Sequence, residues 1–262
     1  MSALTLARSG MAVTVLERHS PVPGTGGILA TDEGLLNKLT GWNAHAPDTE
    51  ATALLTGGFH SWGVIHDALR STAERDDRIT IHHHTRVADA GQDENRAWVV
   101  TDQGQHYEAD IVIGGDGHRS VVRRAVAPHA PDADFAGYVI WIGMPRESTL
   151  PARLRGDRRI GEGAFLNSPN GVLFGNYMPD EENPADPQIG FGWYDNTHNR
   201  FLRDNGNVHG SVVHHSVSRH EIPDHIWAEL AHLAKKDWPS PWSDVLLAAI
   251  VNRPGVSGGS YG

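Results

Sequence analysis

The stretch from Asp110 to Arg123 reads DIVIGGDGHRSVVR and decides the fold class. Its apolar first part, Asp110–Gly114, predicts a buried strand, and the Gly-Gly-Asp-Gly run that follows predicts a tight turn. Residues 120–126 then have the pattern of a helix. A buried strand that passes through glycines into a helix is typical of an α/β fold.

Asp116 falls at the end of this predicted strand, where open α/β sheets place their ligand crevice. The neighbouring glycines allow positive φ angles and a close approach of the backbone to a ligand. The N-terminus of the following helix offers free N–H groups to a phosphate. In the alternative interpretation, Asp116 only caps the helix within a tight strand-to-helix turn. The spacing is compatible with both.

The N-terminal region predicts another piece of the same α/β unit. Residues Ala3–Gly10 have the pattern of a helix that a glycine ends, and Met11–Glu17 has that of a short buried strand. Glu17 ends this strand at the position from which an acidic residue binds the ribose hydroxyls of a dinucleotide. A charge at the rim of a sheet, without any ligand, is the alternative interpretation.

The rest of the chain predicts two domains that divide at Pro128–Pro131, an α/β domain over 1–130 and a mostly antiparallel sheet with C-terminal helices over 131–262. The last twelve residues, Val251–Gly262, have the Gly/Ser-rich composition of a loose tail. Helices are predicted over 32–39, 61–75, 120–126, 226–238 and 242–251. Strands are predicted over 79–87, 97–101, 105–108, 110–114, 138–144, 163–166, 172–177 and 189–194.

Composition argues against several classes of protein. The chain has 262 residues, with 22 Lys and Arg against 32 Asp and Glu, and its net charge of −10 argues against nucleic-acid binding. Because it has no cysteine, it has neither disulfides nor cysteine-ligated metal centres. No apolar run is long enough for a transmembrane helix, and the first residues lack a signal-peptide pattern. We expect a soluble cytoplasmic protein that binds no membrane.

The window Asp110–Arg123 resembles the Asp-Gly motif of FAD-dependent aromatic hydroxylases, the group A flavin monooxygenases of the para-hydroxybenzoate hydroxylase type. It matches the form D-x-x-I-G-x-D-G-x-x-S-x-x-R at every defined position. Leu4–Arg18 is similar to the first helix and second strand of that family. Two more segments, Ser61–Arg70 and Tyr138–Met144, look most like the 2,6-dihydroxypyridine 3-hydroxylase branch.

This resemblance implies a non-covalent FAD, reduced by NADPH or NADH, and the use of O₂ to hydroxylate a small aromatic or pyridinol substrate. By their positions, Glu17 would hold the adenosine ribose with Arg18 next to it. Val87 would lie against the adenine through its backbone. Asp116 would face the flavin pyrophosphate, and Arg123 would orient that loop.

The chain departs from the family at both ends. The family places a strand and a G-x-G-x-x-G loop before its first helix, and it carries a later Gly-Asp motif; here no such loop precedes the helix and no Gly-Asp pair occurs in Val251–Gly262. We therefore expect a truncated chain. Its Rossmann-like FAD-binding domain over 1–130 would lack the first strand and the glycine loop, before a substrate-binding domain over 131–262. We also expect a destabilised sheet beside Met11–Glu17, whose ladder groups would be exposed.

The 17 histidines raise a metal hypothesis. His82 and His84 could share one face of a strand, and the pair His214–His215 would have to come close to them in space. No carboxylate stands at a typical metal-ligand spacing from these residues. A solvated strand face is therefore the favoured interpretation, and we predict no metal site.

Aromatic residues in the second domain suggest a place for the substrate. Trp193 and Tyr194 end a predicted strand where they could form the floor under an aromatic ring, and Trp141 and Tyr177 could contribute. Tyr194 or His198 could act as a base for a phenolic substrate. Ordinary packing of aromatic residues in the core is the alternative. The spacing selects no catalytic residue.

Two alternatives to a working monooxygenase remain. A non-catalytic remnant would keep the fold and bind neither FAD nor a pyridine nucleotide. A binding module would recognise a small aromatic molecule without retaining FAD. A flavin-independent dehydrogenase would need the same absent glycine loop. The expected partner is a small aromatic substrate, and a homodimer is one assembly that the sequence leaves open.

Overall fold

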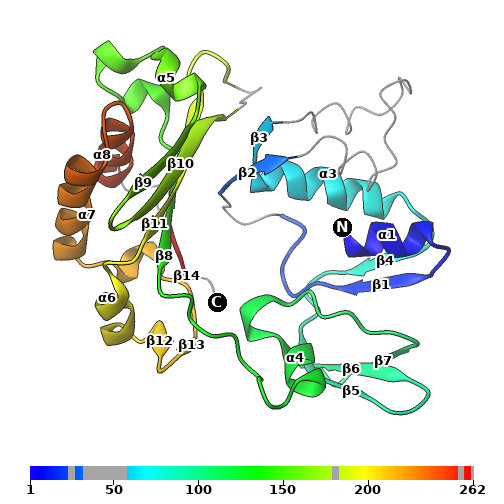
Figure 1. Ribbon diagram of the computed structural model, residues 1–262. Helices are drawn as coiled ribbons and strands as arrows, with labels where there is room; N and C mark the ends of the chain where they lie inside the picture. The colour runs from blue at the N-terminus through cyan, green and yellow to red at the C-terminus, as the bar shows by residue number, and fades with distance from the viewer. Residues whose placement is uncertain (23–26, 32–57, 179–182, 253–256, 261–262) are drawn as a thin grey trace. The chain divides into compact units, whose positions relative to one another are not determined.

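A computed structural model describes residues 1–22, 27–31, 58–178, 183–252 and 257–260 (Figure 1). The chain forms two compact units. Unit 1 comprises Met1–Gly26 and Ala30–Asp132, and unit 2 comprises Gly27–Leu29 and Ala133–Gly262. The predicted helix over 32–39 lies outside the described residues.

Unit 1 has a small core between two helices and a parallel pair of strands. The helices are α1 (Ser2–Arg8) and α3 (Trp62–Glu74), and strand β1 (Val13–Leu16) pairs in parallel with β4 (Ile79–His82). A helix as short as α1 is marginal in water, so its stability depends on packing. The buried residues that form this core are Leu4, Ala7, Ile65, Ala68, Leu69, Ala73 and Ile79.

The predicted ends of both helices are confirmed. Gly10 adopts a φ of +88° just after α1, which ends the helix because glycine takes this conformation at little cost. Ser61 is the N-cap of α3, and its hydroxyl accepts the N–H of Val64 at 3.4 Å. The buried face of α3 includes Ile65, whereas Trp62 is 41% exposed and does not belong to the core.

A second sheet in unit 1 is an antiparallel meander of β5 (Val87–Gln92), β6 (Ala97–Thr101) and β7 (His106–Ala109). The predicted strand 79–87 is thus two strands, β4 and β5, and Val87 begins the second instead of ending the first. Helix α4 (Val121–Val126) packs against β5. The remaining pair, β2 (Ile28–Thr31) and β3 (Gly58–Ser61), forms a two-stranded sheet.

The prediction of a buried strand over Asp110–Gly114 is wrong. These residues belong to no strand, and the side chains of Ile111 and Ile113 are 63% and 55% exposed. A strand needs a hydrogen-bonded neighbour, and within the described residues no strand pairs with this segment. The short 3₁₀ turn Gly117–Arg119 follows and leads into α4.

Unit 2 is built on a five-stranded antiparallel sheet in the order β14-β8-β11-β10-β9 (Figure 1). Helices α7 (Asp224–Asp237) and α8 (Trp242–Asn252) cover one face of this sheet. The strands are β8 (Val139–Gly143), β9 (Ala164–Ser168), β10 (Gly171–Met178), β11 (Gln188–Asp195) and β14 (Ser257–Ser260). Strand β14 corrects the predicted loose tail, since four of its residues pair with β8.

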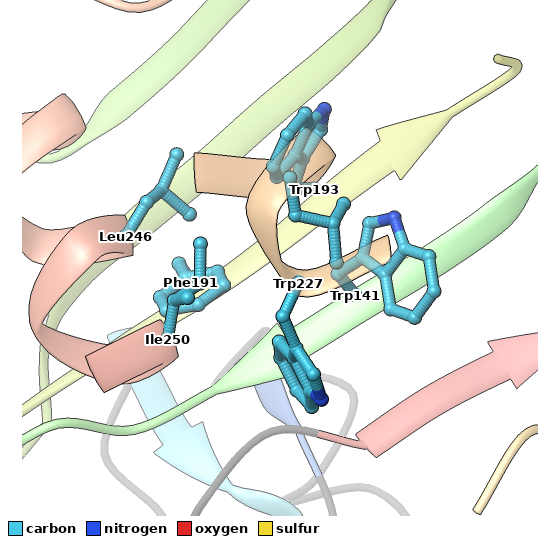
Figure 2. Close-up of a pocket in the computed structure, with 7 residues that line it drawn as sticks. Trp141, Phe191, Trp193, Trp227, Leu246 and Ile250 are labelled. Atoms are coloured by element: carbon cyan, nitrogen blue, oxygen red, sulfur yellow. The ribbon is translucent and has the colours of Figure 1, made fainter. Parts of the chain in front are cut away.

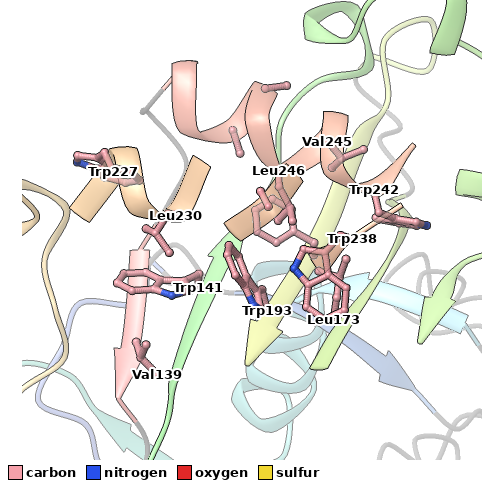
Figure 3. Close-up of a cluster of buried hydrophobic side chains, with 14 of the residues drawn as sticks. Val139, Trp141, Leu173, Trp193, Trp227, Leu230, Trp238, Trp242, Val245 and Leu246 are labelled. Atoms are coloured by element: carbon pink, nitrogen blue, oxygen red, sulfur yellow. The ribbon is translucent and has the colours of Figure 1, made fainter. Parts of the chain in front are cut away.

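Alternation along the strands decides which residues enter the core. Trp141 and Trp193 point to the helices and are only 1% and 2% exposed. Figure 3 shows these two rings meeting Leu230 and Leu246, which come from α7 and α8. For Trp141 and Trp193 the core-packing interpretation is therefore confirmed.

Shorter elements complete unit 2. They are the helices α5 (Arg158–Gly161) and α6 (Asn199–Asp204), the hairpin of β12 (Val208–His209) and β13 (Val212–Val213), and the 3₁₀ turns Glu147–Thr149, Ala152–Leu154 and Arg219–Glu221. No helix among the described ranges has the length and apolar character needed to cross a membrane.

Candidate functional site

The Asp116 side chain organises the loop that carries it. Its Oδ1 accepts the hydroxyl of Ser120 at 2.5 Å, and its Oδ2 accepts the N–H of Val121 at 2.7 Å. The Ser120 hydroxyl in turn accepts the N–H of Arg123 at 2.9 Å. Asp116 and Ser120 therefore satisfy the free N–H groups at the start of α4, as the capping interpretation predicted.

These contacts also fix the charge of Asp116. Partial burial alone would raise the pKa of this carboxyl group, but the hydrogen bonds from Ser120, Val121 and Val122 outweigh it, so the pKa lies below its usual value. Asp116 is therefore an anion at neutral pH. A phosphate near this loop would need cations to offset that charge.

The glycines of the loop differ in their surroundings. A Cβ on Gly114 would lie 2.6 Å from the Cβ of Val122, so this glycine allows α4 to pack closely on the loop. A Cβ on Gly115 or Gly117 would meet no atom within 4 Å, and Gly117 has a φ of +77°. Packing explains Gly114, and backbone conformation explains Gly117. Neither explains Gly115, which leaves open space beside the loop.

Glu17 and Arg18 lie directly after β1. The backbone of Glu17 bonds to His82 and Thr85 at 2.9 and 2.8 Å, and its Oε1 accepts the N–H of His19 at 2.8 Å. The exposed Arg18 donates from Nε to the His19 ring at 2.9 Å. The backbone of this segment is thus well fixed, while the Arg18 guanidinium faces solvent.

The structure brings the Glu17–Arg18 segment close to the Asp116 loop. Burial lowers the pKa of His118, and the positive charges of Arg119 and Arg18 lower it further. The His118 Nε2 is buried and has no hydrogen-bond partner. Arg18, which follows β1, and Arg119, in the turn after Asp116, therefore both lie close to His118. The lowered pKa leaves His118 neutral at neutral pH, so the two arginines are the cations of this place.

Val87 lies at the start of β5, opposite Thr101 of β6, and a bulge follows between Val87 and Asp89. Because α4 packs against β5, this strand is a neighbour of the helix that the Asp116 loop caps. The predicted contact of the Val87 backbone with an adenine stays a prediction. The N–H of Arg123 helps to cap α4, and the predicted orienting role of its side chain also stays a prediction.

In unit 2, the face of the sheet opposite the helices carries an aromatic cluster. The ring of Tyr194 lies 5.2 Å from that of Tyr138 and 5.9 Å from that of Phe174. A Cβ on Gly192 would come within 2.4 Å of the Phe174 ring, so the ring lies over this glycine. Next to Phe174, in register with it on β9, Phe165 is 75% exposed. We call Phe165, Phe174, Tyr138 and Tyr194 the aromatic face.

On the other side of the sheet, Asp195 and His198 form a buried pair. Asp195 accepts hydrogen bonds from the Trp141 indole at 2.7 Å, the Thr197 hydroxyl at 2.6 Å and the His198 ring. The second ring nitrogen of His198 lies 3.5 Å from the Glu229 carboxylate. With His198 only 4% exposed, it is poorly placed as a base for a substrate on the aromatic face.

Tyr177 is also not part of the aromatic face. Partial burial, together with its hydrogen bond to Glu147, raises the pKa of the Tyr177 hydroxyl well above its usual value. Its predicted contribution to a substrate floor is therefore wrong, because its partner lies in the Glu147–Thr149 turn and its ring packs against the core on the helix side.

A cavity of about 10 Å³ lies between the sheet and its helices (Figure 2). Its lining is wholly apolar, and the volume suffices for about one water-sized sphere. It has no polar group that could orient a substrate. Figure 2 shows the side chains that surround it, namely Trp141, Phe191, Trp193, Trp227, Leu246 and Ile250.

The predicted histidine pair in unit 1 does not form as expected. Strand β4 ends at His82, and His84 has a φ of +54°, so the alternation that would place both side chains on one face is broken. The His82 ring instead lies 5.8 Å from that of Tyr107. In the part of the chain that the structure describes, no group of three or more His, Asp and Glu side chains could hold a metal ion.

Several residues described above carry no signal in the sequence motifs. His118 and Arg119 occupy variable positions of the Asp-Gly motif, so the pattern gave them no role. Tyr138 and Phe174 stand one residue away, along their strands, from Val139 and Leu173 in the core. The period-2 alternation of those strands is the signal that could have assigned them to the opposite face.

Over short segments the chain is similar in sequence to two FAD-dependent monooxygenases. No family model matches the chain. It is 48% identical over 48 residues to the FAD-dependent monooxygenase andE of Emericella variicolor, a match that covers 18% of this chain and 10% of that protein. It is 34% identical over 70 residues to the FAD-dependent monooxygenase idtM of Claviceps paspali, covering 27% of this chain and 13% of that protein.

Solved structures cover almost the whole chain. The 2,6-dihydroxypyridine-3-hydroxylase of Arthrobacter nicotinovorans has a TM-score of 0.75 at 22% identity, over 98% of this chain and 68% of that one. CtdE, in complex with FAD and its substrate 4, has a TM-score of 0.64 at 14% identity, over 99% of this chain and 65% of that one. Fold and sequence therefore relate this chain to the FAD-dependent monooxygenases, as the Asp-Gly motif indicated.

Proposed function

We propose that this chain supplies the FAD-binding and substrate-binding parts of a monooxygenase that hydroxylates a small aromatic or pyridinol compound with NAD(P)H and O₂. The observation that carries the proposal is that Arg18 and Arg119, from two segments of the chain, both lie close to His118 in the Asp116 loop. A dinucleotide needs cations for its phosphates and an acid for its ribose, and Arg18 follows Glu17 directly in the sequence.

Bound FAD would supply the redox chemistry and the activation of O₂. The residues of unit 1 would bind and orient it: Glu17 accepts from the ribose hydroxyls, while Arg18 and Arg119 balance the phosphates. Asp116 fixes the conformation of the loop through the hydrogen bonds that it accepts from Ser120 and Val121. Its charge acts against the phosphates, which makes the two arginines more important.

The aromatic face of unit 2 would bind the substrate. Rings of Tyr194, Tyr138 and Phe174 stand at centroid distances of 5.2 to 5.9 Å, in the range of tilted aromatic pairs. A planar pyridinol or phenol added to this cluster gains the same kind of contact. The name of the similar 2,6-dihydroxypyridine-3-hydroxylase supports a pyridinol as the first compound to try.

Oxidation of NADPH and NADH tests this function directly. The purified chain with excess FAD is given 2,6-dihydroxypyridine, and both nucleotide oxidation and O₂ uptake are measured. We expect substrate-dependent oxidation that falls at least tenfold in R18A and R119A, and that stays unchanged in R158A, whose side chain is 90% exposed in unit 2. Equal activity in all four proteins would contradict the proposal.

A binding module that retains no FAD is the second candidate. It is favoured by the core of unit 2, which is continuous from the sheet to α7 and α8 and includes no residue of unit 1. Calorimetry with 2,6-dihydroxypyridine, with and without FAD, separates the two candidates. Equal affinity without FAD, together with no nucleotide oxidation, would identify the module.

A further inference from the structure

A short hairpin in unit 2 has one buried and one outward face. Val208 opposes Val213, and both are nearly fully buried, at 1% and 2% exposure. The outward face begins with His209, which opposes Val212. A two-residue turn that begins at Gly210 joins the two strands. Turns of this length need a positive φ at their first residue, and Gly210 has a φ of +58°.

His209 and His214 both lie on the outward face, because alternate residues of a strand share a face. Both side chains are exposed, and their ring centroids are 4.6 Å apart. This pair differs from the consecutive pair that the sequence suggested. His215 belongs to a different contact: its Nδ1 lies 2.8 Å from the side-chain amide nitrogen of Asn207.

The backbone that carries the two histidines is fixed by hydrogen bonds on both strands. The N–H of His214 donates to the carbonyl of Asn207 at 2.8 Å, and Asn207 is fully buried. At the turn, the Arg203 guanidinium donates to the carbonyl of Gly210. Both strands of the hairpin are therefore held, and a ligand that bridges the rings would have little backbone to order.

We propose that His209 and His214 form a two-imidazole site for a divalent transition-metal ion, with Cu²⁺ preferred. Imidazole nitrogen is a ligand suited to Cu²⁺, Ni²⁺ and Zn²⁺, and affinity for such ligands is highest for Cu²⁺. This site is independent of the proposed flavin chemistry.

The separation of the rings agrees with this choice. With a metal–nitrogen distance of about 2.0 Å, each ring centroid lies about 3.2 Å from the ion. Two imidazoles at a right angle then have centroids about 4.5 Å apart, while a tetrahedral angle gives about 5.2 Å. The observed 4.6 Å is close to the first value, so the two rings need not move apart to occupy adjacent positions of a tetragonal ion. Since the described residues offer no group of three ligands, water would complete the coordination.

Titration with CuCl₂ alone tests the site, using the full chain without an affinity tag. Binding is followed by calorimetry, and the paramagnetic broadening of amide NMR signals locates the ion. We expect broadening centred on residues 207–215, and an affinity at least tenfold lower in H209A and in H214A. The control H220A replaces another exposed histidine of unit 2 and should bind as the unaltered protein does.

Two results would overturn the proposal. One is unchanged affinity in the double variant H209A/H214A, and the other is broadening centred on another of the 17 histidines. The variants H209Q and H214Q serve as a second pair if an alanine variant melts at a lower temperature, because glutamine keeps side-chain bulk on the outward face. Retention of tight binding in those variants would count against the site equally.

Discussion

Asp195 is a fully buried carboxylate that accepts hydrogen bonds from several side chains, and its surroundings show how a buried charge is held. Burial alone would raise the pKa of this carboxyl group, but its hydrogen bonds from His198, Thr197 and Trp141, with the charge of His198, hold the pKa below its usual value. The Asp195 carboxyl group lies on the helix side of the sheet. It therefore stabilises unit 2 and lies on the opposite side from the aromatic face.

Replacing His198 by alanine should destabilise unit 2 by about 3 kcal/mol, because the Asp195 charge would stay in the core with only the neutral donors Thr197 and Trp141. Chemical denaturation, followed by the fluorescence of the buried tryptophans, measures this loss. The control is D204A, which removes an exposed ion pair with Arg200 and should change stability little. Equal stability of the two variants would contradict the assignment.

The lowered pKa of Asp195 also predicts how stability depends on pH. A carboxyl group whose pKa is lower in the folded state stabilises the fold at pH values above its unfolded pKa, which is about 3.9. This contribution is lost as the pH falls through the lower, folded value. The melting temperature should therefore drop below about pH 4, and less steeply in D195N. A parallel decline in both proteins would show that Asp195 is not responsible.

Gly114 and Gly115 offer a matched pair of variants. G114A should destabilise unit 1 by about 1 to 3 kcal/mol, because the new Cβ would lie 2.6 Å from that of Val122. G115A meets no atom within 4 Å and should melt normally, yet weaken FAD binding by filling the open space. Thermal melts and FAD titrations of both variants check this. Normal FAD binding by G115A would place the dinucleotide elsewhere.

At the scale of elements, strand β1 is paired on one side only within the described residues, with β4. Alternate residues of a strand direct their N–H groups to opposite edges. Those of Val13 and Glu17 donate toward β4, at 2.8 and 2.9 Å. Those of Thr14 and Leu16 therefore point away from it, which is the edge that the sequence analysis expected to be exposed.

Hydrogen exchange should distinguish these two sets of amides. We expect slow exchange at Val13 and Glu17 and fast exchange at Thr14 and Leu16, with fast exchange also at Ile111 and Ile113. NMR-detected exchange of the purified chain resolves each amide. Strong protection at Thr14 and Leu16 would show that another strand covers this edge, and would refute the predicted destabilisation of the sheet beside Met11–Glu17.

Local sequence patterns predicted some helices and strands and missed others. Helix α3 and strands β8 to β11 were predicted nearly to the residue, because their caps and alternation are local features. The segment Asp110–Gly114 was predicted wrongly. Its apolar pattern is typical of a buried strand, but a strand forms only where another strand pairs with it. For the same reason β14 was missed, since glycine and serine give no strand signal and only pairing with β8 makes it one.

The whole molecule has a net charge of −10, which makes two arginines close to one histidine, Arg18 and Arg119 near His118, a local exception. The sequence predicted Arg18 as a cofactor-binding residue but not Arg119, because the proximity of both arginines to His118 arises only when the segment after β1 and the Asp116 loop fold together. Likewise the aromatic face could not be read from single residues, because which face of a strand is buried depends on where the helices pack.

FAD retention shows most directly whether this chain holds the cofactor. The purified chain is incubated with excess FAD, desalted, and examined by its visible absorbance spectrum, with R18A/R119A as the matched variant. We expect near-stoichiometric oxidised flavin in the unaltered chain and at least tenfold less in the variant. A folded but colourless unaltered chain would contradict the proposed FAD site, and would show that Glu17, Arg18 and Arg119 do not suffice to hold the cofactor.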